Sequence, residues 1–270
     1  MEGLRVLGKP EWFARYYYEG GADELIYMDV VASLYGRNSL VEIVERTSRE
    51  IFIPLAVGGG LRSLEDIAAV LRAGADKVSL NTAAIGRPEL ISEAARRFGS
   101  STIVVSVEAI KRPDGTYEAF TDNGRESTGL DAMEWAVRAA DLGAGELFVT
   151  SIDREGTGKG FDLDLTREIA DSVTVPVIVC GGAGNTDHVV EAVETGRADA
   201  VSVASVLHYG AVEHFAAAEG QYESEGNIEY LRSGRQFSLM KGATIREIKE
   251  RLVKAGIDTR GDSEVPDVAE

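Results

Sequence analysis

The sequence repeats itself at a constant spacing. GADEL at 21–25 is matched by GAGEL at 143–147, and PLAVGGG at 54–60 is matched by PVIVCGG at 176–182. GADKVSLNTAA at 74–84 is matched by RADAVSVASV, which begins at Arg197, with Gly196 opposite Gly74. Residues 21 and 143, 54 and 176, and 74 and 196 are each 122 positions apart. Self-similarity at a fixed period indicates copies of one structural unit, so we predict two fused halves.

Short apolar runs alternate with amphipathic helical stretches along the chain. The runs are rich in Val, Ile and Leu and barely alternate with polar residues, as in parallel strands that are buried on both faces. Strand alternating with helix indicates a parallel sheet with crossover helices, and 270 residues suit one (β/α)8 TIM barrel, which we place at 1–260. The predicted strands are Glu24–Val30, Pro54–Val57, Lys77–Leu80, Thr102–Val107, Glu146–Ser151, Pro176–Cys180 and Ala200–Ala204.

The repeat predicts an eighth strand that the sequence does not contain. The strand Thr102–Ala109 opens the second half, and its mate, 122 residues earlier, falls before Met1. Either the chain starts late, or the barrel is open, or a later segment, Phe237–Leu239, fills the gap. An unpaired strand edge is an aggregation hazard, so we favour a late start. Residues 210–240 read as an insertion, and the acidic tail 261–270 as disordered.

The charge balance limits the partners. The formal net charge is −17, because 45 acidic residues face 28 Lys and Arg residues. Such a surface repels nucleic acid and anionic membranes, which excludes both as partners. No N-terminal stretch resembles a signal peptide, and no segment approaches about 18 consecutive apolar residues, so we expect a cytoplasmic protein. Cys180 is the only cysteine, and His188, His208 and His214 lack metal-ligand spacing, so we expect neither a metal nor a cofactor.

Small residues follow four of the predicted strands. Gly58-Gly59-Gly60 and its copy Gly181–Gly184 follow two of them, and Asn81-Thr82 and its copy Ala204-Ser205 follow two more. Glycines let backbone N–H groups approach an anion, although they also simply make tight turns. The carboxyl ends of barrel strands form the active face. We therefore predict two phosphate sites on opposite sides of the barrel mouth, spanned by a diphosphorylated small molecule.

Three carboxylates follow predicted strands and are the candidates for catalysis. Asp29, Glu108 and Asp153 would lie between the two phosphate sites, where a carboxylate can act as general acid or base. Asp29 and Asp153 are equally well read as partners of arginines or as loop caps, whereas we favour a functional role for Glu108. The polar loop Ser151–Gly160, which carries Asp153 and Glu155, is either a lid over the substrate or a plain surface loop.

Three further charges lie where strands begin. Glu24, Lys77 and Glu146 each open a predicted strand, so all three face the bottom of the barrel. They form either an ion-pair ring at a narrow opening or a stabilising network with no other role. Charged groups near a barrel floor are costly unless they are paired, so we expect them to contact one another in either case.

Together these motifs resemble the cyclase subunit of imidazole glycerol phosphate synthase, the HisF family. The resemblance covers roughly Gly3 to Tyr209 and resumes over Ile245–Arg260. The chain resembles the related isomerase of the same pathway less closely, notably at the segments SIDREGT and NTAA. The resemblance to the cyclase subunit rests on DELIYMDVVAS (23–33), VGGG (57–60), ADKVSLNTAA (75–84), GAGELFVTSIDREGTGKGFD (143–162) and GGAG (181–184).

The resemblance implies a lyase-type cyclase that works with a glutaminase. The glutaminase subunit docks at the barrel bottom, and its ammonia crosses the barrel to a bisphosphorylated ribulosyl intermediate, giving imidazole glycerol phosphate and an aminoimidazole ribotide. Glu24, Lys77 and Glu146 match three of the family's four charged residues at the ammonia entrance. Gly60, Asn81 and Thr82 match one phosphate site, and Gly156, Gly182, Ala204 and Ser205 match the other.

The chain also departs from the family pattern. The family uses two catalytic aspartates, and the first has no counterpart because the first strand is absent; a gate arginine and a loop lysine are lost with it. The second aspartate is replaced by Glu108, and the lid aspartate by Glu155. Catalytic geometry tolerates about 0.5 Å of misplacement, so these longer side chains matter.

Three readings follow from these departures. The chain is a HisF-type enzyme, or a paralogue whose ammonia serves another amidation such as that of a surface sugar, or a non-catalytic barrel that binds phosphorylated ligands. The gate and the two phosphate sites count against the third reading. Glu108, Glu155 and the insertion at 210–240 favour the second.

Overall fold

Seven parallel strands form the inner wall of the molecule. The computed structural model describes residues 9–29, 40–208, 211 and 242–261. The strands pair in the order β1-β2-β3-β4-β7-β8-β9, which confirms the α/β class, and each of the seven predicted strands is present. They are β1 (Leu25–Met28), β2 (Leu55–Gly58), β3 (Lys77–Leu80), β4 (Ile103–Lys111), β7 (Glu146–Ser151), β8 (Val177–Cys180) and β9 (Ala200–Val201).

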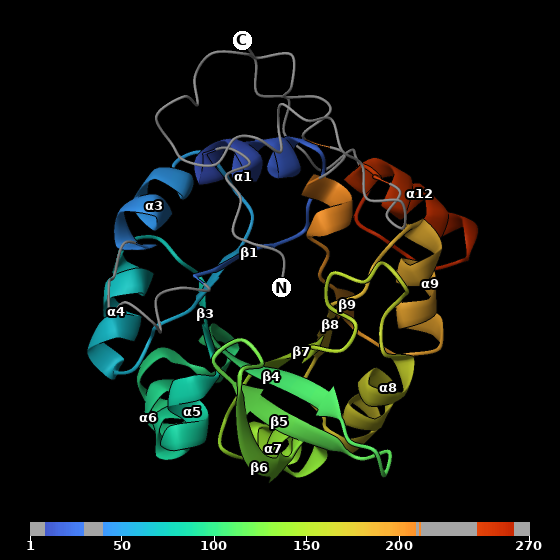
Figure 1. Cartoon of the computed structure of the whole chain (residues 1–270). Helices are drawn as coiled ribbons and strands as arrows, with labels where there is room; N and C mark the ends of the chain where they lie inside the picture. Colours follow the sequence, from blue (N-terminus) through green and yellow to red (C-terminus); the bar gives the residue numbers. More distant parts are fainter. Residues whose placement is uncertain (1–8, 30–39, 209–210, 212–241, 262–270) are drawn as a thin grey trace.

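Helices surround this wall as an outer layer (Figure 1). Apolar strand residues such as Val57, Val105 and Val149 are fully buried between the two layers. No helix in the described ranges is long and apolar enough to cross a membrane. The helices are α1 (Pro10–Glu19), α3 (Leu40–Thr47), α4 (Leu64–Arg72), α5 (Thr82–Gly86), α6 (Glu89–Phe98), the short η1 (Ser100–Thr102), α7 (Ala132–Asp141), α8 (Leu163–Ser172), α9 (Thr186–Glu194) and α12 (Ile245–Lys254).

The twofold repeat is visible in the bounds of the elements. Helices α1 and α7, helices α4 and α9, and strands β2 and β8 are each offset by 122 residues at both ends. The offset assigned to the third sequence match was wrong by one residue. Ala56 pairs with Lys77 in the first half, whereas Ile178, its mate, pairs with Ala200 in the second. The extra residue lies in the turn after α9, where Arg197 has a φ of 59°.

The described residues leave the barrel open between β1 and β9. Helix α7 follows β4, but no described strand precedes α1, which is the mate of α7. Strand β1 is only half-buried along its length, whereas β2 is fully buried. The helix layer nevertheless continues across the gap, because the Tyr17 hydroxyl on α1 lies 2.5 Å from Nδ1 of His208. The predicted segment Phe237–Leu239, the insertion at 210–240 and the tail at 261–270 fall almost entirely outside the described residues.

An antiparallel hairpin leaves the barrel wall at β4. Strand β4 runs on to Lys111, beyond its predicted end, and pairs with β5 (Tyr117–Thr121), which pairs in turn with β6 (Glu126–Asp131). This hairpin is not among the elements predicted from the sequence. Its signal is the turn Arg112-Pro113-Asp114-Gly115, in which Pro presets the backbone and Gly115 supplies a φ of 92°.

Candidate active site

The three charged residues that open strands meet at the bottom of the barrel. Nζ of Lys77 lies 2.7 Å from Oε2 of Glu24 and 2.7 Å from Oε1 of Glu146. Burial raises the pKa of Glu24. Burial alone would lower the pKa of Lys77, but hydrogen bonds to the two carboxylates outweigh it and raise that pKa. The other oxygen of Glu146, Oε2, is buried and has no hydrogen-bond partner among the described residues. Among the described residues, the ion cluster therefore has one hydrogen-bond acceptor, Oε2 of Glu146, that lacks a donor.

Glu108 lies at the opposite end of the barrel, on β4. Its side chain is buried, and Oε2 accepts a 2.8 Å hydrogen bond from the backbone N–H of Gly124. Gly124 lies in the turn between β5 and β6, residues 122–125, which we call the hairpin tip. Burial raises the pKa of this carboxyl, and the nearby acids Glu155 and Asp122 add to the effect. The Gly124 N–H and the Asn81 amide act in the opposite direction without cancelling it. A carboxyl with a raised pKa is suited to exchanging protons near neutral pH.

The hairpin tip also reaches the predicted phosphate residues at the end of β3. The Asn81 side chain donates to the carbonyl of Phe120 at 3.2 Å, and Thr82 Oγ1 accepts from the N–H of Asp122 at 3.3 Å. Oδ1 of Asn81 is buried and lacks a partner in the described ranges. Asn81, Thr82 and Glu108 therefore all contact the β5–β6 part of the hairpin, and the sequence did not predict this grouping because it did not predict the hairpin.

The glycines predicted to bind phosphate also allow close backbone packing. A Cβ on Gly59 would lie 2.3 Å from the carbonyl oxygen of Asp29, and one on Gly182 would lie 2.2 Å from that of Gly160. Asp29 itself follows β1, and its N–H donates to the carbonyl of Gly58 at 2.9 Å. Packing alone thus accounts for glycine at positions 59 and 182.

The other predicted phosphate residues lie at strand ends. Gly60 has a φ of 72° in the turn after β2, and Gly156, with a φ of 71°, lies in the loop after β7. After β9, residues 205–208 are helical, and the N–H of His208 donates to the carbonyl of Ala204. Ser205 thus begins a helical turn, where backbone N–H groups are available to an anion.

Replacing Gly182 by alanine is expected to destabilise the protein by about 2–4 kcal/mol, through the clash with Gly160 and the strain of a φ of 110°. Thermal or urea unfolding measures this effect. Gly115 is the matched control, because its φ is 92° but no atom lies within 4 Å of its Cβ position. Equal losses for Gly182→Ala and Gly115→Ala would contradict the packing argument.

The loop Ser151–Gly160 spans the space between the hairpin and the glycine loop after β8. On one side the N–H of Ile152 donates to the carbonyl of Ala109 at 3.0 Å, and on the other the N–H of Gly160 donates to the carbonyl of Gly182 at 2.8 Å. Desolvation at the mouth raises the pKa of Glu155. Burial, with a smaller contribution from Glu155, raises the pKa of Cys180 to about 11, so this thiol stays protonated and inert.

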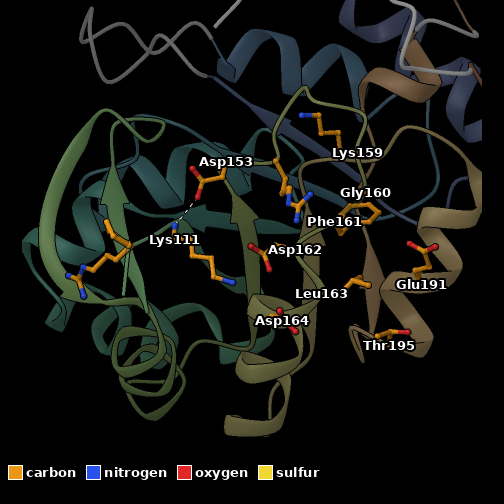
Figure 2. Close-up of a pocket in the computed structure, with 13 residues that line it drawn as sticks. Lys111, Asp153, Lys159, Gly160, Phe161, Asp162, Leu163, Asp164, Glu191 and Thr195 are labelled. Atoms are coloured by element: carbon orange, nitrogen blue, oxygen red, sulfur yellow. Dashed lines mark hydrogen bonds between the residues drawn. The ribbon is translucent and has the colours of Figure 1, made fainter. Parts of the chain in front are cut away.

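Asp153 does not share the mouth with Glu108. Its Oδ2 accepts a 2.8 Å hydrogen bond from the backbone N–H of Lys111 (Figure 2), so it takes the capping role that the sequence left open. It faces a groove of about 780 Å³ on the flank of the barrel. The groove is lined by Lys111, Arg112, Pro113, Asp153, Arg154, Lys159, Gly160, Phe161, Asp162, Leu163, Asp164, Glu191 and Thr195.

Two of the histidines have structural roles. His208 is packed against Phe13 and Tyr17, and burial lowers its pKa. His188 accepts through Nδ1 from the N–H of Gly184 at 3.1 Å. His214 lies outside the described residues. Within the described ranges, no three His, Cys, Asp or Glu side chains gather in a way that could hold a metal ion.

Comparison with known proteins shows the family to which the chain belongs. The family model described as "Histidine biosynthesis protein" matches residues 2–213. The chain is 56% identical over 187 residues to the imidazole glycerol phosphate synthase subunit HisF of Legionella pneumophila, an alignment that covers 69% of this chain and 88% of the relative. The chain therefore belongs to the histidine biosynthesis protein family, and within it resembles the HisF subunit.

Proposed function

We propose that the chain is a HisF-type cyclase subunit that uses ammonia to form imidazole glycerol phosphate from a bisphosphorylated ribulosyl intermediate. The observation that carries the proposal is the placing of the charges. Lys77 bridges Glu24 and Glu146 at the strand N-termini, and the buried Glu108 lies at the strand C-termini of the same barrel. This arrangement supports an ammonia entrance at one end of the barrel and a proton-exchanging carboxylate at the other.

Each end has a distinct role in the proposed reaction. The ion cluster meets ammonia as it leaves a glutaminase subunit docked below. At the top, the phosphates of the substrate bind at the ends of β2 and β3 and of β8 and β9, where Gly60, Asn81, Thr82, Gly182 and Ser205 lie. Glu108 then moves protons as ammonia adds to the substrate and the ring closes. Asp29, at the end of β1, is the candidate for the second carboxylate.

The ion cluster also supports the proposal that a fourth charged residue completes the entrance. Oε2 of Glu146 is buried and unsatisfied among the described residues, which is costly for a carboxylate oxygen. A cation on a strand between β9 and β1 would satisfy it. Among the described strands, β1 and β9 each pair on one side only, which supports the same placement.

Two assays test the proposed activity. Expression in a histidine auxotroph that lacks its own cyclase subunit is expected to restore growth when a matching glutaminase is present. The purified protein is expected to convert the ribulosyl intermediate with an ammonium salt as the nitrogen source. No turnover, with or without an upstream extension that supplies another strand, would reject the proposal.

One observation favours a second candidate, a paralogue whose ammonia amidates a surface sugar. Glu108 and Glu155 are each one methylene longer than the family's aspartates, and Glu108 is already engaged by the hairpin tip. In that case the ribulosyl intermediate is not consumed, although ammonia released by the glutaminase still crosses the barrel. Trapping of that ammonia in a complex that does not convert the intermediate would identify this candidate.

Phe52 is the expected contact for the glutaminase. Its ring is 79% exposed between the buried Ile51 and Ile53, just before β2 and therefore on the bottom rim. Phe52→Ala is expected to weaken binding of the glutaminase by about 10-fold or more, because exposed aromatics at interface centres dominate binding. Glutamine-dependent turnover is expected to fall, and ammonium-dependent turnover to stay unchanged. Val253 on α12, which is 60% exposed, provides the control Val253→Ala. An unchanged Kd for Phe52→Ala would contradict this contact.

A further inference from the structure

Asp153 lies in the loop after β7, and its side chain lines the groove described above, which Glu108 does not line. Figure 2 shows the carboxylate beside Lys111, at the groove that both residues line. Its Oδ2 accepts a 2.8 Å hydrogen bond from the Lys111 N–H at the end of β4. A carboxylate that accepts a backbone N–H fixes the two segments relative to each other.

This bond joins the two pieces of chain that carry the carboxylates of the mouth. The hairpin that begins with β4 returns to place the N–H of Gly124 on Glu108. The loop carries Glu155, whose charge is felt by Glu108. Ile152 packs so closely on the hairpin tip that a Cβ on Gly124 would lie 2.8 Å from its Cγ2. The loop and the hairpin therefore meet through Ile152 and Asp153.

Packing does not hold the outer side of this contact. Asp153, Arg154 and Lys159 line the groove of about 780 Å³, so open space rather than side chains lies against this face of the loop. The hydrogen bond of Asp153 is thus a side-chain link between the loop and β4, next to the backbone bond from the Ile152 N–H to the Ala109 carbonyl.

We propose that Asp153 is a positioning residue, whose hydrogen bond to Lys111 holds the loop on the hairpin and so fixes Glu155 relative to Glu108. The proposal rests on the cyclase function proposed above and assigns no contact between Asp153 and substrate. A displacement of about 1 Å in a catalytic arrangement can cost up to about 100-fold in rate. Loss of this link is therefore expected to slow the chemical step rather than to weaken substrate binding.

The test compares two substitutions of Asp153. Asn retains an oxygen that accepts from the Lys111 N–H, whereas Ala does not. Asp153→Ala is expected to lower the ammonium-dependent kcat by about 10-fold or more, with KM and Tm little changed, and to speed hydrogen exchange across residues 152–160. Asp153→Asn is expected to stay within about 3-fold of the parent. Asp164→Ala is the matched control, because Asp164 lines the same groove but pairs with Arg167 on α8.

The outcomes separate this proposal from the proposed function. A normal kcat for Asp153→Ala, or an equal loss for Asp153→Asn, would overturn the positioning role. A parent protein without cyclase activity would instead reject the function. In that case hydrogen exchange across residues 152–160 still tests whether the Asp153–Lys111 hydrogen bond holds the loop. Unchanged exchange in Asp153→Ala would overturn the positioning role.

Discussion

Glu108→Gln is expected to lower the ammonium-dependent kcat by about 10²–10⁴-fold. Glutamine keeps the size of the side chain and can still accept from the Gly124 N–H, but it cannot take up or release a proton at neutral pH. Steady-state kinetics with the ribulosyl intermediate and an ammonium salt measures the effect. Glu126→Gln, on exposed β6 of the same hairpin, is the control and is expected to leave kcat unchanged.

The same substitution is expected to stabilise the fold at neutral pH. Burial raises the pKa of Glu108 in the folded state above its value in the unfolded chain. The contribution of Glu108 to stability is therefore fully present below the unfolded pKa, about 4.3 for a glutamate, and is lost as the pH rises through the folded pKa. Glu108→Gln removes that loss, so its Tm is expected to exceed that of the parent at pH 7 and to approach it near pH 4.

The pH profile gives an independent check on Glu108. If its ionised form is the base, kcat/KM of the parent is expected to rise with pH through a pKa above that of an ordinary glutamate. This rise is expected to disappear in Glu108→Gln. A variant with parental turnover and an unchanged profile would show that Glu108 only holds the hairpin tip.

Among substitutions in the ion cluster at the bottom of the barrel, Lys77→Met has the largest expected effect on stability. It leaves Glu24 and Glu146 half-buried side by side without a cation. Removing one partner of a buried ion cluster costs about 3–5 kcal/mol, and the partial exposure of these three side chains reduces this to about 1–3 kcal/mol. Denaturant unfolding at pH 7 measures the loss. Lys159→Met, at a lysine that lines the groove after β7 and is not part of the ion cluster, is the control.

The loss in Lys77→Met is expected to depend on pH and on its neighbours. Burial already raises the pKa of Glu24, and without Lys77 that pKa rises further, so acidification neutralises Glu24 and narrows the stability gap between the variant and the parent. Adding Glu24→Gln and Glu146→Gln is expected to recover much of the stability, because the remaining repulsion is removed. A stability loss that is unchanged at low pH would contradict the ion-cluster account.

The functional effect of Lys77→Met distinguishes an ammonia entrance from a purely stabilising network. Turnover with glutamine and the glutaminase is expected to fall by about 10-fold or more, since an entrance residue is lost. Turnover with free ammonium ion as the nitrogen source is expected to change much less. Equal losses in both assays would leave the cluster with a stabilising role alone.

The amino-acid sequence by itself determined the architecture and the ends of the barrel. Apolar runs and their spacing report which segments are buried strands, and a repeated spacing reports that two halves share one fold. Because these signals are local or periodic, they can be read from the sequence without a structure. The direction of each strand then places Glu24, Lys77 and Glu146 at one end and Glu108 at the other, which is how the ion cluster was anticipated from its members.

Only the tertiary structure decided which groups meet. The N–H of Gly124 reaches Glu108 because the β4–β5–β6 hairpin folds back, and this depends on strand register that no local pattern encodes. For the same reason the sequence left two readings of Asp153, catalysis and capping, whereas the structure shows that its carboxylate accepts from the Lys111 N–H. Hydrogen bonds between distant segments depend on the register and turn geometry of both partners, which a linear pattern does not contain.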